Sequence, residues 1–273
     1  MKQKATNMFF LLFILMLVIL FFFLQQTQTN QQNPISSSET TLDITCSPLN
    51  TSTISPTCSP SQATKDDGIF SYSQGPKAWE AKRVWSGSWA EMTLDGNKFG
   101  SFGCGLCCLA NIYSTLSGHV CSPIDMYDHA KEVSNYTPSY GYGAIDWNAM
   151  QSTILSCGFS SSLEKKPLKY KKFKHTVANI PCAVVLVSSY YNDTFWKNTP
   201  GHYVTIWNYS SEDDTVFLSD SGDPNRNRQR IPLRYIYDAL KESSNYQLLC
   251  IHSYSEDENQ WGWDEISDEW IAP

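Results

Sequence analysis

The chain has 273 residues, of which 41% are hydrophobic and 17% are charged, and its formal net charge is −7 at pH 7. Seven acidic residues without a Lys or Arg lie in segment 255–273, so the rest of the chain is close to neutral. This balance argues against a nucleic-acid partner, because such proteins carry basic patches.

An apolar segment near the N-terminus predicts where the protein is located. Residues 8–24 form an unbroken run of 17 apolar residues, and Lys2 and Lys4 precede it in segment 1–7. A run of this length fits a short membrane helix or a signal-peptide core. No small-residue cleavage site follows, and the preceding lysines favour a signal-anchor with residues 1–7 in the cytosol. We expect a single-pass type II membrane protein with its domain luminal or extracellular, and secretion after cleavage is the alternative.

Residues 25–67 are predicted to form a linker or stalk, since the stretch from Pro34 to Lys65 is dominated by Ser, Thr, Pro and Asn. Sequons agree with a secretory route and give glycosylation candidates at Asn50, Asn135, Asn192 and Asn208. The nine cysteines leave at least one thiol unpaired within the chain. Cys46 and Cys58 are candidates for a disulfide in the linker, and Cys104 is the candidate for the unpaired thiol.

Residues 68–254 have the composition of one globular domain in which helices precede strands. The predicted helices span 106–116, 124–133 and 146–157, a short one follows the lysine-rich stretch 165–174, and another lies near 233–241. The predicted strands span 182–187, 202–207, 215–218 and 246–252. Helices first and a mostly antiparallel sheet later indicate an α+β fold.

The first helix is preceded by a candidate nucleophile, Cys104, which lies between Gly103 and Gly105. Glycines permit a tight bend and a close approach of a substrate carbonyl. At the N-terminus of a helix, unpaired amides and the macrodipole favour a thiolate over a thiol. A thiolate is the attacking species in cysteine-dependent catalysis. The alternative is a buried structural cysteine.

Two residues on consecutive strands are candidates to assist Cys104. His202 begins its predicted strand after Pro200-Gly201, which suits a general base at the end of the sheet. Asp220 closes the next strand, so a hairpin would return it to the same end, where an acceptor can orient the imidazole. Asp223 is the alternative acceptor because Asp223-Pro224 is a turn signal.

The C-terminal segment 255–273 combines its acidic residues with Trp261, Trp263 and Trp270. We expect a solvated, disordered tail. Docking of the tryptophans on the domain is the alternative.

The stretch from Gln74 to Tyr254 resembles the peptidase C39-like domain, a branch of the papain-like cysteine peptidases. The residues that carry the resemblance are Gln74-Gly75-Pro76-Lys77-Ala78-Trp79, Gly103-Cys104-Gly105, Leu109-Ala110, Leu116-Ser117-Gly118, Asp146-Trp147, Cys157-Gly158-Phe159, Ile180-Pro181, Gly201-His202-Tyr203-Val204 and Leu218-Ser219-Asp220. Their order and approximate spacing match over most of the domain.

The resemblance implies a papain-like fold, with N-terminal helices that carry the cysteine packed on an antiparallel sheet that carries the histidine. It implies Cys104 as nucleophile, His202 as general base and acid, Asp220 as orienting residue, a peptide or protein substrate, and no metal or cofactor. Related families place a Gln six residues before the nucleophile, where this chain has Lys98. Asn97 is therefore the oxyanion-hole candidate, and the alternative is that the Cys104 backbone amide acts with another group.

Two other functions use the same features. Cys104-Gly105-Leu106-Cys107 is a C-x-x-C at a helix start, which is typical of a thiol-disulfide oxidoreductase. Such sites follow a buried strand, whereas residues 95–101 are predicted to form a loop. The second alternative is a catalytically inactive C39-like binding domain on a membrane stalk.

Overall fold

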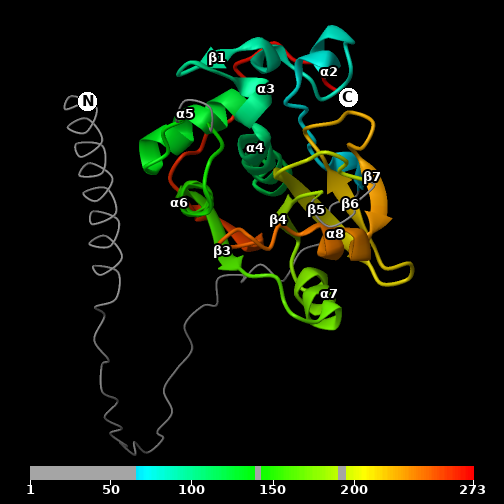
Figure 1. Cartoon of the computed structure of the whole chain (residues 1–273). Coiled ribbons are helices and arrows are strands. Elements are labelled where there is room, and N and C mark those ends of the chain that lie inside the picture. Colours follow the sequence, from blue (N-terminus) through cyan, green and yellow to red (C-terminus); the bar gives the residue numbers. More distant parts are fainter. Residues whose placement is uncertain (1–65, 139–142, 190–194) are drawn as a thin grey trace, which may run out of the picture. The chain divides into compact units, whose positions relative to one another are not determined.

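The computed structural model describes residues 66–138, 143–189 and 195–273 (Figure 1). Several predicted features lie outside these ranges. They are segments 1–7 and 8–24, nearly all of linker 25–67, the cysteines Cys46 and Cys58, and the sequon residues Asn50 and Asn192. Within them, none of the helices combines the length and the apolar character that a membrane span requires.

The predicted helices of the N-terminal half are confirmed to within one or two residues at each end. The α-helices are α2 (Pro76–Glu80), α3 (Phe99–Phe102), α4 (Cys104–Leu116), α5 (Pro123–Val133), α6 (Trp147–Ser156), α7 (Tyr170–Ala178) and α8 (Leu233–Ala239), and 3-10 turns η1 (Asp66–Gly68) and η2 (Ser88–Glu91) precede α3. Asp146 caps α6, as predicted, because its carboxylate accepts hydrogen bonds from the amides of Asn148 and Ala149 at 2.8 and 3.0 Å.

The main sheet is antiparallel throughout and has the order β3-β8-β4-β5-β6-β7. Its strands are β3 (Cys157–Glu164), β4 (Cys182–Val187), β5 (His202–Ser210), β6 (Thr215–Ser219), β7 (Gln229–Pro232) and β8 (Leu248–Asn259), and a hairpin of β1 (Thr93–Leu94) and β2 (Asn97–Lys98) stands apart from it. Helices combined with an antiparallel sheet confirm the predicted α+β class at that level.

The sequence did not predict the two edge strands, β3 and β7. Gly158 has a φ of +84°, which agrees with the predicted end of α6, but the chain then continues directly into β3. A run of three serines in β3 interrupts the hydrophobic pattern by which a strand is predicted. Strand β7 is only four residues long and ends at Pro232. Edge strands bury little apolar surface, so their sequences lack the hydrophobic pattern of central strands.

Helices cover both faces of the sheet. Alternate residues of β4 belong to different cores: Val184 belongs to the core that includes residues of α4 and α6, whereas Val185 belongs to the core that includes residues of α7 and α8. This double burial explains why β4 reads as a continuous apolar run. Helix α4 packs on β5, so the helix that begins with Cys104 contacts the strand that begins with His202.

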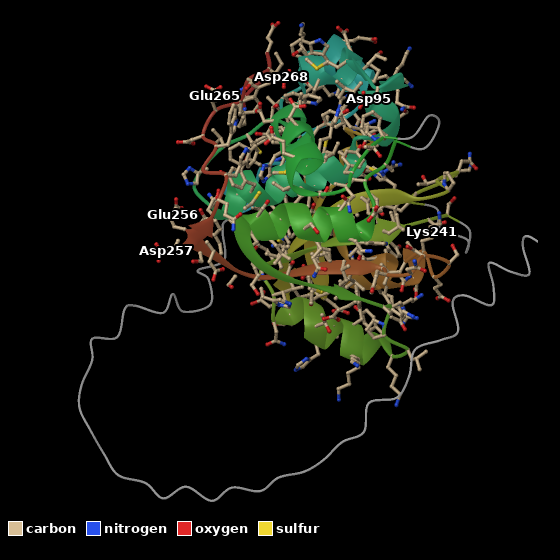
Figure 2. The ribbon with its side chains drawn as sticks, turned by 90° about the vertical axis from the view of Figure 1, so that its left-hand side faces the viewer. Asp95, Lys241, Glu256, Asp257, Glu265 and Asp268 are labelled. Carbon is tan, nitrogen blue, oxygen red and sulfur yellow. The ribbon has the colours of Figure 1, made fainter. Side chains whose placement is uncertain are left out.

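The prediction of a disordered tail was wrong, because residues 255–273 are docked on the domain. Strand β8 continues to Asn259, and the Trp261 ring then stacks on His129 with 4.3 Å between ring centroids. Trp270 packs against Tyr72 and Trp85, and the amide of Ile271 donates to the Ser86 carbonyl at 2.8 Å. Figure 2 shows the acidic side chains Glu256, Asp257, Glu265 and Asp268 along this segment. The aromatic residues supply the buried contacts that the acidic composition obscured.

Replacing Trp270 with alanine should therefore destabilise the domain. Trp270 is half-buried, so we expect the free energy of unfolding to fall by about 1–3 kcal/mol, below the 3–5 kcal/mol typical of a fully buried tryptophan. Urea denaturation measures the change, and Leu168→Ala, at a fully exposed residue, is the control. An unchanged unfolding midpoint in Trp270→Ala would show that the tail does not dock.

Candidate active site

Cys104 is the first residue of α4, directly after Gly103 as N-cap, and its side chain is 8% exposed. The flanking glycines serve close packing and not the tight bend that we expected, because neither has a positive φ. A Cβ at Gly103 would lie 2.4 Å from the Phe99 ring, and one at Gly105 would lie 2.5 Å from Ile145. The glycines therefore let neighbouring side chains close around the N-terminus of α4.

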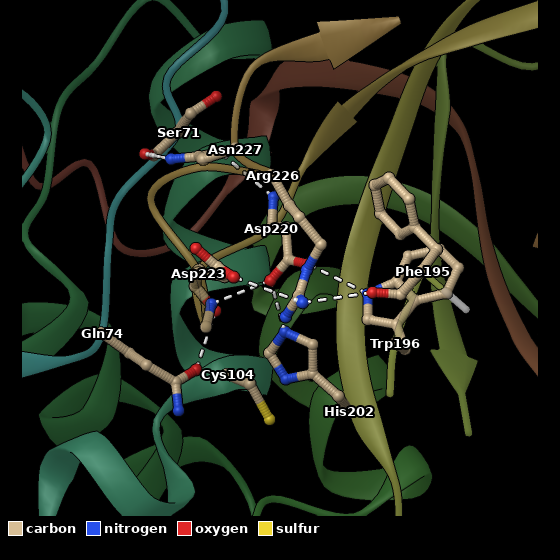
Figure 3. Close-up of polar contacts among 12 residues, drawn as sticks. Ser71, Gln74, Cys104, Phe195, Trp196, His202, Asp220, Asp223, Arg226 and Asn227 are labelled. Atoms are coloured by element: carbon tan, nitrogen blue, oxygen red, sulfur yellow. Dashed lines mark hydrogen bonds and ion pairs between the residues drawn. The ribbon is translucent and has the colours of Figure 1, made fainter. Parts of the chain in front are cut away.

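His202 and Asp220 lie together at one end of the sheet. Strands β5 and β6 are antiparallel neighbours, so the start of β5 and the residue after β6 meet. The distance from Nε2 of His202 to Oδ1 of Asp220 is 2.7 Å. This contact leaves Nδ1 of His202 for the thiol, and Figure 3 shows the Cys104 sulfur beside the His202 ring. Asp223, the alternative acceptor, instead forms an ion pair with Arg226 at 3.3 Å.

Asp220 is held by donors that the sequence did not point to. The carboxylate is fully buried, and Oδ1 also accepts from the Gly222 amide at 2.9 Å. Oδ2 accepts from Nε1 of Trp196 at 3.0 Å and from Nε of Arg226 at 3.1 Å. Trp196 lies far from Asp220 in sequence, and Arg226 is one of two arginines in the loop between β6 and β7, so neither has a local motif. These contacts fix the carboxylate that orients the imidazole.

The charges of the site favour an ionised pair. Burial by itself would raise the pKa of the Cys104 thiol, but the hydrogen bond and the charge of His202 outweigh it and hold that pKa below its usual value. Burial by itself would lower the pKa of His202, but the Asp220 carboxylate outweighs it and raises that pKa. The pKa of Asp220 is lowered despite its burial, because His202 and Arg226 stabilise the carboxylate. Both shifts are in the direction that favours a thiolate beside an imidazolium.

The other described cysteines have the opposite electrostatics. Burial raises the pKa of Cys107 and Cys108, the two thiols next to the site, well above the ordinary value. Burial raises the pKa in the same way for Cys121, Cys157, Cys182 and Cys250. Within the described ranges every cysteine is a free thiol. Cys104 alone among these seven has a lowered pKa.

Gln74 lies at the site, although it was not among the predicted site residues. Its Oε1 accepts from the hydroxyl of Ser221, next to Asp220, at 2.8 Å, and its Nε2 donates to the Gly100 carbonyl at 2.9 Å. Figure 3 shows Gln74 on the same side of His202 as Cys104. Asn97, the predicted oxyanion donor, lies on β2, where its Nδ2 donates to the Asp95 carbonyl at 3.3 Å. Gln74 could have been found from the sequence, because it begins the first of the segments that resemble the C39-like family.

Two predicted glycosylation residues lie within the described ranges. Asn135 is exposed in the loop after α5. Asn208 lies on β5, where its Nδ2 donates to Oδ1 of Asp66 at 2.9 Å. In residues 66–138, 143–189 and 195–273, no group of three or more His, Cys, Asp or Glu side chains has the arrangement of a metal site.

Fold and site together define an α+β domain with a buried cysteine, histidine and aspartate at one end of its sheet. No protein-family model matches the chain, and no curated protein sequence matches it. A similar solved structure is the peptidase domain of Streptococcus ComA, a bifunctional ABC transporter of a quorum-sensing pathway, with a TM-score of 0.39, 13% identity and coverage of 56% of this chain and 93% of that one. Another is a C39-like peptidase from Bacillus anthracis, with a TM-score of 0.38, 12% identity and coverage of 56% and 90%.

Proposed function

We propose that the protein is a cysteine-dependent hydrolase of peptide or amide bonds, with a papain-like arrangement of its C39-like domain. The observation that carries the proposal is the 2.7 Å contact between His202 and the buried Asp220, next to a Cys104 thiol at the N-terminus of α4. Such a set supplies a nucleophile, a proton carrier and an orienting carboxylate. The chemistry requires no metal or cofactor.

The reaction follows from the charges of the ionised pair. Sγ of Cys104 attacks the substrate carbonyl carbon, and the imidazolium of His202 gives its proton to the leaving amine as the carbon–nitrogen bond breaks. The product is a thioester between Cys104 and the acyl part of the substrate. His202, now neutral, accepts a proton from water, which hydrolyses the thioester and restores the thiolate and the imidazolium.

The oxyanion of each tetrahedral intermediate needs hydrogen-bond donors. We assign this role to the backbone amide of Cys104, at the first position of α4, and to Nε2 of Gln74 in place of Asn97. The Gln74 amide carries two N–H bonds and gives one to Gly100, so the second is available. Removal of one such donor typically costs about 100- to 1,000-fold in rate.

We propose that segment 8–24 anchors the protein in a membrane as a type II signal-anchor, with residues 25–67 as stalk and the hydrolase domain on the luminal or extracellular side. Burial of the described thiols is compatible with that location. Cys107, Cys108, Cys121, Cys157, Cys182 and Cys250 are all buried, and burial raises their pKa values, so oxidants react with them slowly.

Selective alkylation tests the proposed nucleophile. At pH 6, iodoacetamide should modify Cys104 ahead of the other cysteines and stop digestion of a peptide mixture in proportion to the modification. In His202→Ala the rate of Cys104 alkylation should fall about 100-fold, because an ordinary thiol with a pKa near 8.5 is almost entirely protonated at pH 6. Peptide mass mapping after brief labelling gives the rates.

His175→Ala is the matched control, since His175 is an exposed residue of α7. It should leave both the alkylation rate and the digestion unchanged. Equal modification of several cysteines, with digestion surviving, would contradict the proposed function.

A further inference from the structure

A cavity of about 570 Å³ opens beside the candidate site. One wall is formed by Gly75, Pro76, Lys77 and Ala78, which follow Gln74, and the facing wall by residues 221–225, which follow Asp220. A Cβ added to Gly222 in this second wall would lie 2.9 Å from Nε2 of His202. Gly222 therefore packs against the Nε2 side of the imidazole, and the cavity lies beside the candidate site, although neither His202 nor Cys104 lines it. Its volume lies within the range of ligand pockets.

The lining of this cavity is positively charged, in contrast to the acidic chain. Lys77 and Arg83 both line it and are both exposed. Among the described residues, neither cation forms an ion pair, and Arg83 donates only to the neutral Oδ1 of Asn225, at 3.1 Å. Asp223 is the one acidic residue in the lining, and Arg226 already neutralises it. Lys77 and Arg83 thus face the cavity, and neither is paired with a carboxylate.

A second hollow of about 300 Å³ continues the first, because both are lined by Ser73, Arg83 and Pro224. Arg83 consequently lies where the two hollows join, and Lys77 lines the first hollow together with Gly222. A peptide that extended from Cys104 into this groove would contact Lys77 and Arg83. Carboxylates are the peptide groups that guanidinium and ammonium donors bind most strongly.

We propose that this cavity selects a carboxylate of the substrate close to the scissile bond, through Lys77 and Arg83. The carboxylate is either an acidic side chain or the C-terminus of the peptide, since the two groups have the same charge and the same acceptors. The inference rests on the proposed hydrolase function, because the cavity matters for cleavage only if His202 and Cys104 act on a bound peptide.

A binding experiment tests the cavity without requiring turnover. The full-length Cys104→Ala protein is mixed with short synthetic peptides, each made with Glu or Gln at one position and with a free or an amidated C-terminus, and the retained peptides are measured by mass spectrometry. The amount of each carboxylate-bearing peptide retained should exceed that of its neutral counterpart by about fivefold for each cation that contributes. Loss on Glu→Gln exchange identifies a side chain, and loss on amidation identifies the C-terminus.

Three variants in the Cys104→Ala background decide whether the cavity is responsible. Lys77→Gln and Arg83→Gln should each reduce the enrichment, and the double variant should abolish it. Lys82→Gln is the matched control, because it removes the same charge from the same segment at a residue that lies over the Trp79 ring and not in the cavity lining. The proposal would be overturned if no peptide were retained, if acidic and neutral peptides were retained equally, or if the enrichment survived in the double variant.

Digestion of the same peptides by the unmodified full-length chain separates this inference from the proposed function. Cleavage should show the same carboxylate preference in kcat/KM, and the preference should fall in the double variant. Cleavage without any charge preference would refute the cavity's role and leave the hydrolase standing. Selective binding without cleavage would refute the hydrolase and leave the carboxylate site standing.

Discussion

Replacing Cys104 with alanine should abolish peptide cleavage. The variant keeps His202, Asp220 and the groove but has no group that forms the thioester, so the expected loss is of the order of 10⁶-fold, as for other nucleophiles of a catalytic triad. A digest of a peptide mixture followed by mass spectrometry measures it. Because the side chain is small and the helix start is kept by its neighbours, the unfolding midpoint should change little.

Cys107→Ala is the control that separates hydrolysis from thiol-disulfide exchange. Cys107 is fully buried, lies one helical turn after Cys104 and has a raised pKa, so a hydrolase does not need it. Its replacement should leave peptide cleavage within a few-fold of the parent. If Cys107→Ala instead abolished a dithiol exchange activity, and neither variant affected cleavage, the oxidoreductase alternative would be correct.

Asp220→Asn should reduce kcat by about 10⁴-fold, the loss seen when the orienting carboxylate of a triad becomes an amide. The amide keeps the shape of the side chain but removes the charge that raises the pKa of His202 and that neutralises Arg226. The same substitution should destabilise the domain by about 3–5 kcal/mol, because it leaves the buried His202 and the half-buried Arg226 without their carboxylate. Steady-state kinetics and urea denaturation measure the two effects.

The pH dependence of stability gives an independent check. The pKa of Asp220 is lowered in the folded protein, so its contribution is present above about pH 3.9, the unfolded value, and is lost as the pH falls through the folded value. Asp220→Asn should lack this acid-dependent part. Asp238→Asn, at an exposed i,i+4 pair with Arg234, is the control and should leave kcat and stability nearly unchanged. Full activity of Asp220→Asn would rule out a need for the carboxylate charge, and full activity of Asp220→Ala would rule out an orienting role.

The helices, the central strands and the candidate nucleophile could be predicted from local sequence. A capping aspartate such as Asp146, an apolar period and a continuous β-branched run each act over a few residues, and they set α6, α4 and β4 directly. Cys104 could be found in the same way, since a cysteine before a helical pattern is a local feature.

The partners of Asp220 and the identity of the buried amide beside Cys104 could not be predicted in this way. Trp196, Arg226 and Gln74 reach the site from three separate segments, and only the packing of the sheet against α4 brings them together. The docked tail is a similar case, because its composition is acidic while Trp261 and Trp270 find their contacts on distant helices and loops.

The sequence by itself therefore determined the α+β class, the start of the helix that carries Cys104 and the strands that carry His202 and Asp220, because these depend on short-range periodicity and capping. Only the tertiary structure decided the 2.7 Å pairing of His202 with Asp220, the hydrogen bond between Ser221 and Gln74 next to that pair, and the cavity lined by Lys77 and Arg83. Such features depend on contacts between residues far apart in the chain, and the free energy of those contacts is gained only when the whole core has formed.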